Sequence, residues 1–452
     1  MKTDLLNGSI TKSLLVFAIP MLLSNIFQQL YNTVDMVIVG HFLGETALAS
    51  IGACSVIFDL LLFFAIGVGR GFSIVAARNY GAGNKDAFKC TVVGAIAVGI
   101  LLTLFISVTA SLFMIPLLKL INIPAYIIDM AYSYISILTI FLIVTFTYNL
   151  CAGLLYAIGD STMPLLFLVI SSILNIVFDI VFITRFNMGV RGAAAATVVA
   201  QSISTVLCLF YIFKRCPILI PHKEHFHYDA ALYKELVAQG FSMGFMISIV
   251  SLGSVVLQSA INGLGYLVIA GHITARKINS FCMMPMNTIS MALSTFVSQN
   301  KGANQLNRIR KALRYGNLIS IIWAVFITTV LMFSSSTLIR LLSGSNESII
   351  IENGARYLII NSPFYIVLGM LFNLRFALQG IGEKIIPLIS SAIEFVGKII
   401  FAFLLVPVLG YFGVIICEPI IWCIMLLQLI YSFYTNPYIR GKTITDESSQ
   451  VT

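Results

Sequence analysis

The sequence predicts an all-α, polytopic membrane protein of twelve transmembrane helices, arranged as two lobes of six helices each. Three observations support this fold class: the composition, the length of the apolar runs, and a repeat that relates the two halves. Of the 452 residues, 59% are hydrophobic and 10% are charged, whereas soluble domains contain about 25% charged residues. Such a chain is suited to a lipid environment.

Two halves of the chain repeat the same short motifs. Asn-Tyr-Gly-Ala at 79–82 and Asn-Lys-Gly-Ala at 300–303 each end a long apolar run. The spacing between these two motifs also relates Gly44 to Gly265 and Gly189 to Gly410. Pro164 and Pro387 are related by a slightly longer spacing. An internal repeat of half the chain is typical of membrane transporters.

Twelve apolar runs are each long enough to cross a hydrocarbon core of about 30 Å as a helix, which satisfies its own backbone hydrogen bonds there. In the first half they span 14–39, 46–68, 90–114, 127–151, 163–184 and 192–213. In the second half they span 238–262, 266–297, 315–335, 355–378, 385–407 and 413–435. The first run is too long for the core of a signal peptide, so we expect it to stay in the mature chain.

An even number of spans per half means that both halves enter the membrane from the same side, so the repeats are parallel and related by a pseudo-twofold axis along the membrane normal. Eighteen basic residues in the connections fall on one side and five on the other. By the positive-inside rule, both termini are expected in the cytoplasm. The net charge of +9 therefore reports topology and requires no nucleic-acid partner.

These boundaries define four segments. Residues 1–213 form an N-lobe, 214–237 a cytoplasmic linker, 238–436 a C-lobe and 437–452 a cytoplasmic tail. The linker contains His222, His225 and His227, which could suggest a metal site. No cysteine or carboxylate cluster completes such a site in the sequence, so we interpret the segment as a solvated linker. Gly67 to Gly71 reads GVGRG but ends a predicted span and is not a phosphate-binding loop.

Polar residues inside the apolar spans are the candidate functional residues, because an ionised carboxylate at mid-bilayer costs about 2.5 to 3.5 kcal/mol. Gln28, Tyr31, Asn32 and Asp35 recur at steps of three and four in the first span and therefore share one helix face, beyond a kink expected at Pro20.

In the fifth span, Asn175 and Asp179 are four residues apart and also share a face. The two faces can converge on one poorly hydrated pocket, in which burial and like charge favour binding of a proton. The alternative is that Asp35 and Asp179 lie near the helix ends and reach headgroup water.

Four features carry a resemblance to a known family: LYNTVD at 30–35, the Asn175 and Asp179 pair, GDSTMP at 159–164, and the repeated Asn-x-Gly-Ala turns. On these features the whole chain resembles the multidrug and toxic compound extrusion (MATE) transporters. The resemblance implies two six-helix lobes around a V-shaped cavity, and export of organic cations such as drugs and dyes in exchange for H⁺ or Na⁺.

The family's first-lobe ion site falls on Asp35, Asn175, Asp179 and Thr197, whose oxygens suit either a proton relay or a Na⁺ cage. We expect Phe27, Gln28, Tyr31 and Asn32 to line the substrate cavity. No cofactor is expected besides the coupling ion.

The second lobe departs from one branch of the family, which has acids in the seventh and tenth spans where this chain has Gln258 and Arg375. It carries its own intramembrane charges, and Gln258, Arg276, Glu394 and Lys398 form a candidate polar path. Glu394 and Lys398, four residues apart, could equally be a structural pair. Arg276 and Lys277 could snorkel to the interface, so we assign them no separate role.

Two other functions were considered. A flippase for lipid-linked precursors would need a basic cavity for a diphosphate, and Arg276, Lys277 and Arg375 keep this alternative open. A membrane-embedded enzyme would need a catalytic motif such as DDxxD or HExxH, and the sequence contains neither. We therefore expect a transporter, not an enzyme, that acts as a monomer in the plasma membrane of a prokaryote.

Overall fold

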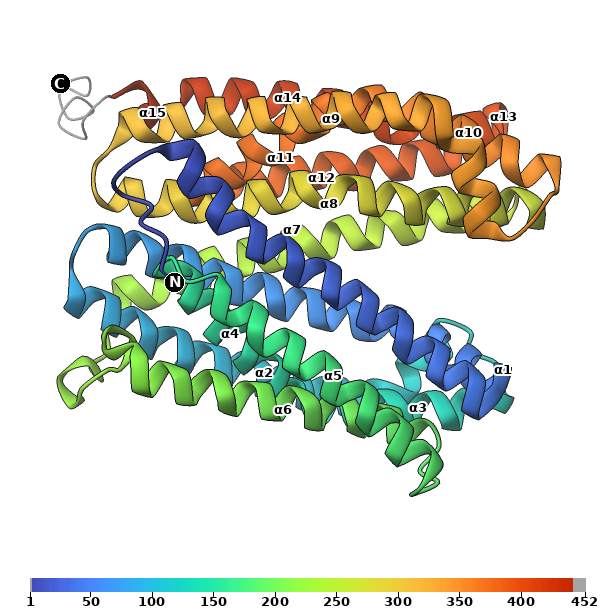
Figure 1. The fold of residues 1–452 in the computed structure, drawn as a ribbon, viewed down its shortest axis with the longest axis horizontal. Helices are drawn as coiled ribbons and strands as arrows, with labels where there is room; N and C mark the ends of the chain where they lie inside the picture. Colours follow the sequence, from blue (N-terminus) through green and yellow to red (C-terminus); the bar gives the residue numbers. More distant parts are fainter. Residues whose placement is uncertain (1, 442–452) are drawn as a thin grey trace. The chain divides into compact units, whose positions relative to one another are not determined.

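The structure is a computed structural model that describes residues 2–441, and the part of the chain that it describes is helical without a β-strand (Figure 1). The chain separates into two compact units. Of the described residues, the first unit contains 2–4 and 19–244, and the second contains 5–18 and 245–441. Two of the three boundaries fall inside helices, after Ala18 and after Gly244. Most of the predicted C-terminal tail lies outside the described residues.

The helices of the first half begin and end as follows: α1 Ile10–Gly81, α2 Lys85–Leu120, α3 Ala125–Ile140, α4 Leu142–Ala157, α5 Thr162–Thr184 and α6 Val190–Arg215. The connection to the second half contains two short 3₁₀ turns, η1 Pro217–Leu219 and η2 Lys223–His225. Helix α1 contains two of the predicted spans, separated at Gly44, whose φ of 82° and ψ of 179° interrupt the helix.

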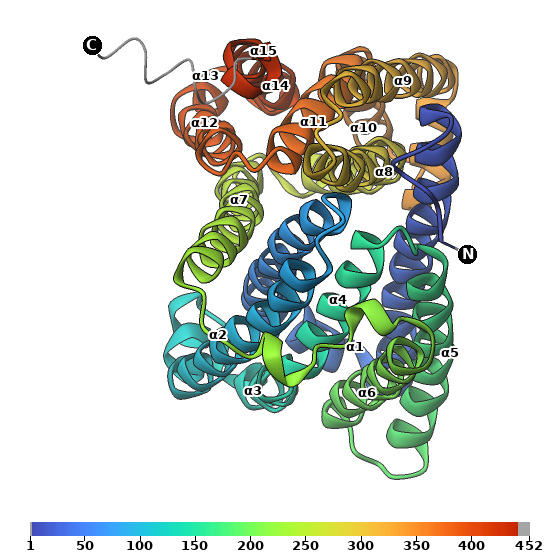
Figure 2. The ribbon, with the colours of Figure 1, turned by 90° about the vertical axis from the view of Figure 1, so that its left-hand side faces the viewer.

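The helices of the second half are α7 Ala230–Asn262, α8 Tyr266–Gly302, α9 Leu306–Ser343, α10 Ser348–Asn361, α11 Tyr365–Gly380, α12 Ile385–Ile400, α13 Val406–Leu409, α14 Tyr411–Thr435 and α15 Pro437–Arg440. A 3₁₀ turn, η3 Ser362–Phe364, joins α10 to α11, and a π-helical turn, η4 Phe401–Leu405, joins α12 to α13. Within the second unit α8 packs beside α9, α10 and α11, and α12 packs beside α14 (Figure 2).

Among the described residues, nine helices are long and apolar enough to cross a membrane, or ten if the bent pair α3 and α4 forms one span. All of the predicted spans lie on helices. Helix α1 contains the first two spans, and α10 and α11 together contain the tenth. Helix α8 covers the eighth predicted span but is not among these nine helices. It is the helix that carries His272, Arg276 and Lys277. The prediction of a polytopic all-α membrane protein is confirmed.

The predicted repeat is confirmed by the positions at which helices begin. The offset from the start of α5 to the start of α12 equals the offset from the start of α4 to the start of α11. The backbone repeats as well: Gly189 has φ 59° and ψ −141°, and Gly410 has φ 58° and ψ −140°. Only glycine adopts this conformation readily, so each half needs glycine at the start of its last long helix.

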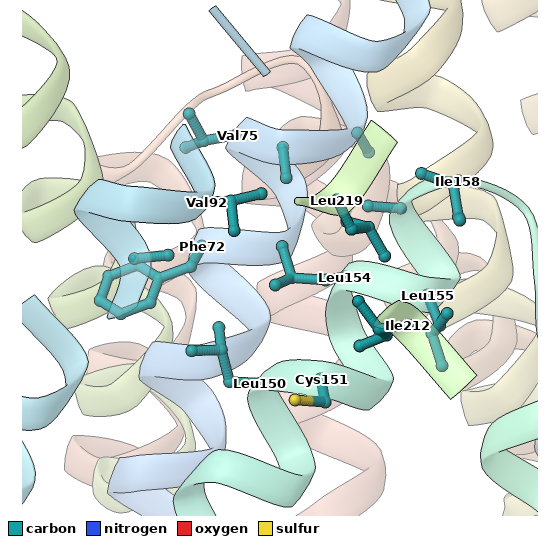
Figure 3. Close-up of a cluster of buried hydrophobic side chains, with 14 of the residues drawn as sticks. Phe72, Val75, Val92, Leu150, Cys151, Leu154, Leu155, Ile158, Ile212 and Leu219 are labelled. Atoms are coloured by element: carbon teal, nitrogen blue, oxygen red, sulfur yellow. The ribbon is translucent and has the colours of Figure 1, made fainter. Parts of the chain in front are cut away.

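A continuous apolar core lies in the first unit between the ends of α1, α2, α4 and α6 (Figure 3). Phe72, Leu154 and Ile212 are among its buried side chains, and each comes from a different helix. Figure 3 shows these helices converging on Leu150 and Leu155 from α4. This core fixes α4 and α6 against α1 within the unit that holds the candidate ion site.

The GVGRG run of α1 is a helix-packing motif. A Cβ atom on Gly67 would stand 2.7 Å from the Cα of Gly244, and one on Gly71 would stand 2.6 Å from the Cα of Gly240. Gly67 and Gly71 are four residues apart on α1, and Gly240 and Gly244 are four residues apart on α7. Each helix therefore presents a small-xxx-small face, and the two faces let the backbones of α1 and α7 approach closely. The start of α7 therefore packs within the first unit.

Candidate functional site

Asp35 of α1 and Asp179 of α5 meet inside the first unit. Their carboxyl groups lie close enough to interact with each other. Asp179 is fully buried and Asp35 is partly buried. The structure thus favours a common pocket over the alternative in which both acids reach headgroup water.

Asn175 and Thr197 complete this cluster. One turn before Asp179 on α5, Asn175 is 2% exposed, and its Nδ2 donates to Thr197 Oγ1 of α6 at 3.3 Å. With the oxygen and nitrogen of the amide exchanged, the nitrogen donates to Asp179 Oδ2 at 3.2 Å and the oxygen accepts from the Thr197 backbone N–H at 3.3 Å. The exchanged amide satisfies more partners and orients one carboxylate.

One oxygen of each acid lacks a partner. Asp35 Oδ1 and Asp179 Oδ1 are both buried and make no hydrogen bond within the described chain. Buried polar atoms are normally satisfied, so an exception of this kind marks a place where a water molecule, a proton or an ion can bind. The oxygens of Asn175 and Thr197 lie beside them. A proton or a small monovalent cation with oxygen ligands fits this set.

Two tyrosines contact the acids electrostatically. Tyr31 lies on α1 one turn before Asp35, and the charges of both Asp35 and Asp179 act on its hydroxyl. Tyr134 of α3 is 9% exposed and lies near the same two acids. Tyr31 was predicted from its helical spacing, whereas Tyr134 was missed. The only sequence signal for Tyr134 was its hydroxyl, a polar group within an apolar run.

The remaining predicted cavity residues lie on the exposed side of α1. Phe27 is 38% exposed, and Gln28 and Asn32 are also exposed. Their assignment to the substrate path remains a prediction. Asp59 of α1 is a further acid within a predicted span, and its side chain is exposed. Sequence reasoning overlooked it, although it is also a charged residue within an apolar run.

The intramembrane charges of the second unit form ion pairs. Arg276 Nη1 of α8 lies 2.5 Å from Glu418 Oε1 of α14. Lys398 Nζ lies 2.9 Å from Glu394 Oε1 on the same helix α12, as their spacing indicated. Arg375 of α11 lies 3.8 Å from Glu394 Oε2.

Gln258 takes no part in these ion pairs. Its side chain donates to Asn262 at 2.9 Å on the exposed side of α7.

The linker histidines form a hydrogen-bonded cluster outside the membrane spans. Potential ligand atoms of His222, Glu224 and His225 lie within 4.8 Å of one another, which the sequence spacing alone did not reveal. Lys89 Nζ lies 2.9 Å from His222 Nδ1, and His225 Nε2 faces Asp86 Oδ1 at 3.4 Å. A lysine ammonium thus occupies one imidazole nitrogen, and the contacts tie the linker to the start of α2.

Comparisons with known proteins agree with this architecture. The MatE family model matches the chain twice, at residues 20–181 and 243–404. The chain is 29% identical over 437 residues to the probable multidrug resistance protein YoeA of Bacillus subtilis, covering 94% of each chain. It is 25% identical over 399 residues to the probable multidrug resistance protein NorM of Thermotoga maritima, covering 85% of this chain and 83% of the relative.

The fold matches solved structures along nearly its whole length. A structure described as the outward-facing conformation of a multidrug resistance MATE family transporter of the MOP superfamily superimposes with a TM-score of 0.88 at 23% identity, covering 95% of this chain and 96% of that one. The two family matches together span well over half of the chain. The chain therefore belongs to the MATE family of membrane transporters.

Proposed function

We propose that this protein exports organic cations in exchange for H⁺ or Na⁺, with the coupling ion bound at Asp35 and Asp179. The pair of adjacent buried carboxyl groups, each with one unpartnered oxygen, carries the proposal. Asn175 and Thr197 supply further oxygens to the same pocket. The names of the relatives, which describe multidrug resistance proteins, support the substrate class.

The exchange follows because the organic cation and the coupling ion compete for the negative charge of the same pocket. When the pocket carries negative charge, it attracts an amphipathic cation to the aromatic and amide side chains of α1, among them Phe27 and Tyr31. A proton or Na⁺ that arrives from outside neutralises the pocket and removes this attraction. Bending of α1 near Pro20 would then release the cation. Each elementary charge that moves inward contributes about 2.3 kcal/mol per 100 mV of membrane potential.

The setting of this exchange follows the sequence-based expectations. We infer a monomer in the plasma membrane of a prokaryote. Both of its termini lie in the cytoplasm in this proposal, because the basic residues of the connections concentrate on one side.

The flippase alternative is weakened by the second unit. Its intramembrane arginines face acids, Arg276 with Glu418 and Arg375 with Glu394. Paired guanidinium groups would have to break these contacts before they could bind a diphosphate, at a substantial desolvation cost.

The test is uptake of a fluorescent organic cation into inverted vesicles, with H⁺ and Na⁺ gradients imposed separately. Wild type should respond to one gradient, and Asp35→Asn should abolish that response while inserting normally. Asp129→Asn removes an exposed acid at the start of α3 and is the matched control. Gradient-driven transport by the Asp35→Asn variant would contradict the proposal, and absence of flux in wild type under either gradient would favour the flippase.

A further inference from the structure

The second unit contains structural counterparts of the residues that surround the two acids of the proposed ion site, and the repeat identifies them. Helix α5 begins at Thr162 and α12 at Ile385. The two family matches, which begin at residues 20 and 243, have the same offset as these two helices. This register places Lys398 where the first unit has Asn175. It also places Gln258 and Ala402 where the first unit has Asp35 and Asp179, so the two acids themselves are not repeated.

The other two counterparts follow from the starts of their own helices. Helix α6 begins at Val190 and α14 at Tyr411, so Glu418 corresponds to Thr197. Helix α10 follows α3 at the offset that relates α12 to α5, so Tyr357 corresponds to Tyr134. The amide, hydroxyl and phenol of the first unit therefore correspond to an amine, a carboxylate and a phenol in the second.

The contacts show that these counterparts form one site. Tyr357 donates to Glu418 Oε2 at 2.8 Å, and Arg276 donates to Glu418 Oε1 at 2.5 Å. The charge of Lys398 also acts on Glu418, just as Asn175 contacts Thr197 in the first unit.

The two sites differ in what satisfies their carboxylates. In the first unit Asp35 and Asp179 each retain an unpartnered buried oxygen, whereas both oxygens of Glu418 have partners. The partner of Oε1 is a cation covalently attached to α8. Neither a proton nor a metal ion is needed to complete the second site.

We propose that Arg276 is a tethered substitute for the coupling ion, so that the second unit permanently holds the positive charge that the first unit must take up in each transport cycle. The inference rests on the proposed role of Asp35 and Asp179. It implies that Glu418 would become a binding site for a free monovalent cation, H⁺ or Na⁺, once the guanidinium is removed. It also implies that the wild-type chain couples transport through one lobe only.

The surroundings of Glu418 are consistent with a cation site. Beside Arg276, the titratable groups that interact with Glu418 are His272 of α8, Tyr357 of α10, Tyr365 of α11, Lys398 of α12, and Cys417 on its own helix. Lys398 is held by Glu394 at 2.9 Å and by Ser254 Oγ at 3.1 Å. Glu394 thus compensates Lys398, and Glu418 compensates Arg276.

The experiment uses the full-length chain in an Asp35→Asn background, which removes the first site. Thermal unfolding midpoints are measured in detergent across a Na⁺ series, with choline as the balancing cation, and across a pH series. Five proteins are compared: wild type, Asp35→Asn alone, and Asp35→Asn combined with Arg276→Gln, with Lys277→Gln, or with both Arg276→Gln and Glu418→Gln. Lys277 is the exposed neighbour of Arg276 on α8, so its replacement removes the same charge outside the site.

The proposal expects Arg276→Gln to lower the midpoint and to make it rise by several degrees with Na⁺ or with acid, because a bound cation stabilises the folded state. The Lys277→Gln control and the variant that also lacks Glu418 should show no such rise. An Arg276→Gln variant that is destabilised but no more cation-sensitive than the control would overturn the proposal. So would misfolding that neither cation rescues.

A failure of the proposed transport site would look different. In that case Asp35→Asn alone would keep the full cation response of the wild-type protein. The response added by Arg276→Gln would still report on the second site, since it is measured relative to the Lys277→Gln control.

Discussion

Replacing Gly71 by alanine tests the close packing of α1 on α7. A Cβ at this position would lie 2.6 Å from both the Gln239 carbonyl oxygen and the Gly240 Cα. Non-bonded carbon atoms prefer about 3.5–4.0 Å, so the two backbones would have to separate by about 1 Å. The neighbouring contact of Gly67 with Gly244 would loosen at the same time.

Overpacking of this kind costs about 1–3 kcal/mol, and the obstacle here is backbone that cannot rotate away. Gly52→Ala is the matched control, because Gly52 lies in the same helix with no atom within 4 Å of its Cβ position. Alanine is favoured over glycine in a helix by about 0.8–1.0 kcal/mol, so the control should unfold at or above the wild-type midpoint. Gly71→Ala gains the same helix propensity, so the two variants should differ by the overpacking cost alone, about 1–3 kcal/mol.

The assay is thermal or denaturant unfolding of the purified full-length protein in detergent, followed by cation uptake into vesicles. Gly71→Ala should unfold several degrees below Gly52→Ala and show reduced transport. Equal unfolding midpoints for the two variants would refute the reasoning, because they would mean that α1 and α7 do not pack as closely as the structure describes.

Three further variants probe the charges inside the membrane. Asp179→Asn should abolish gradient-driven export while preserving insertion, because one proton or cation can no longer bridge two carboxylates; gradient-driven uptake into vesicles measures this, and retained coupling would contradict it. Thr197→Val removes one oxygen of the site with little change in volume and should weaken the response to the coupling ion without abolishing export, which a titration of transport against ion concentration would reveal. Glu394→Gln leaves Lys398 and Arg375 without their acid and should destabilise the protein by about 3–5 kcal/mol, as measured by unfolding midpoints; a change below about 1 kcal/mol would show that the pair contributes little.

Local patterns in the sequence were sufficient to predict the helices and to select part of the proposed ion site. The apolar runs predicted the spans because a helix in lipid satisfies its own backbone groups, whatever its neighbours are. Asn175 and Asp179 were predicted as site residues because an amide and an acid one turn apart must share a helix face. The same spacing allowed Glu394 and Lys398 to be a structural pair or part of a polar path, and the structure contains the ion pair.

Contacts between distant segments were beyond local patterns. Arg276 and Glu418 are separated by 142 positions, and no local pattern in either segment identifies the other residue as its partner. Tyr134 was missed because a tyrosine in an apolar span is ordinarily a packing residue, and only the placement of α3 beside the acids gives it a role. The GVGRG run was excluded as a phosphate loop, but its actual partner, Gly240 and Gly244, required the packed helices.

The sequence by itself determined that this chain spans a membrane, that it consists of two related halves, and which polar residues those halves place in lipid. These properties depend on composition, on periodicity and on the repeat. Each of them can be recognised within one stretch of sequence or by comparing one half of the sequence with the other. The tertiary structure decided which charges remain unpartnered and which are already neutralised by a neighbour. That distinction depends on distances of a few ångströms between helices, and it separates the proposed ion site of the first unit from its ion-paired counterpart in the second.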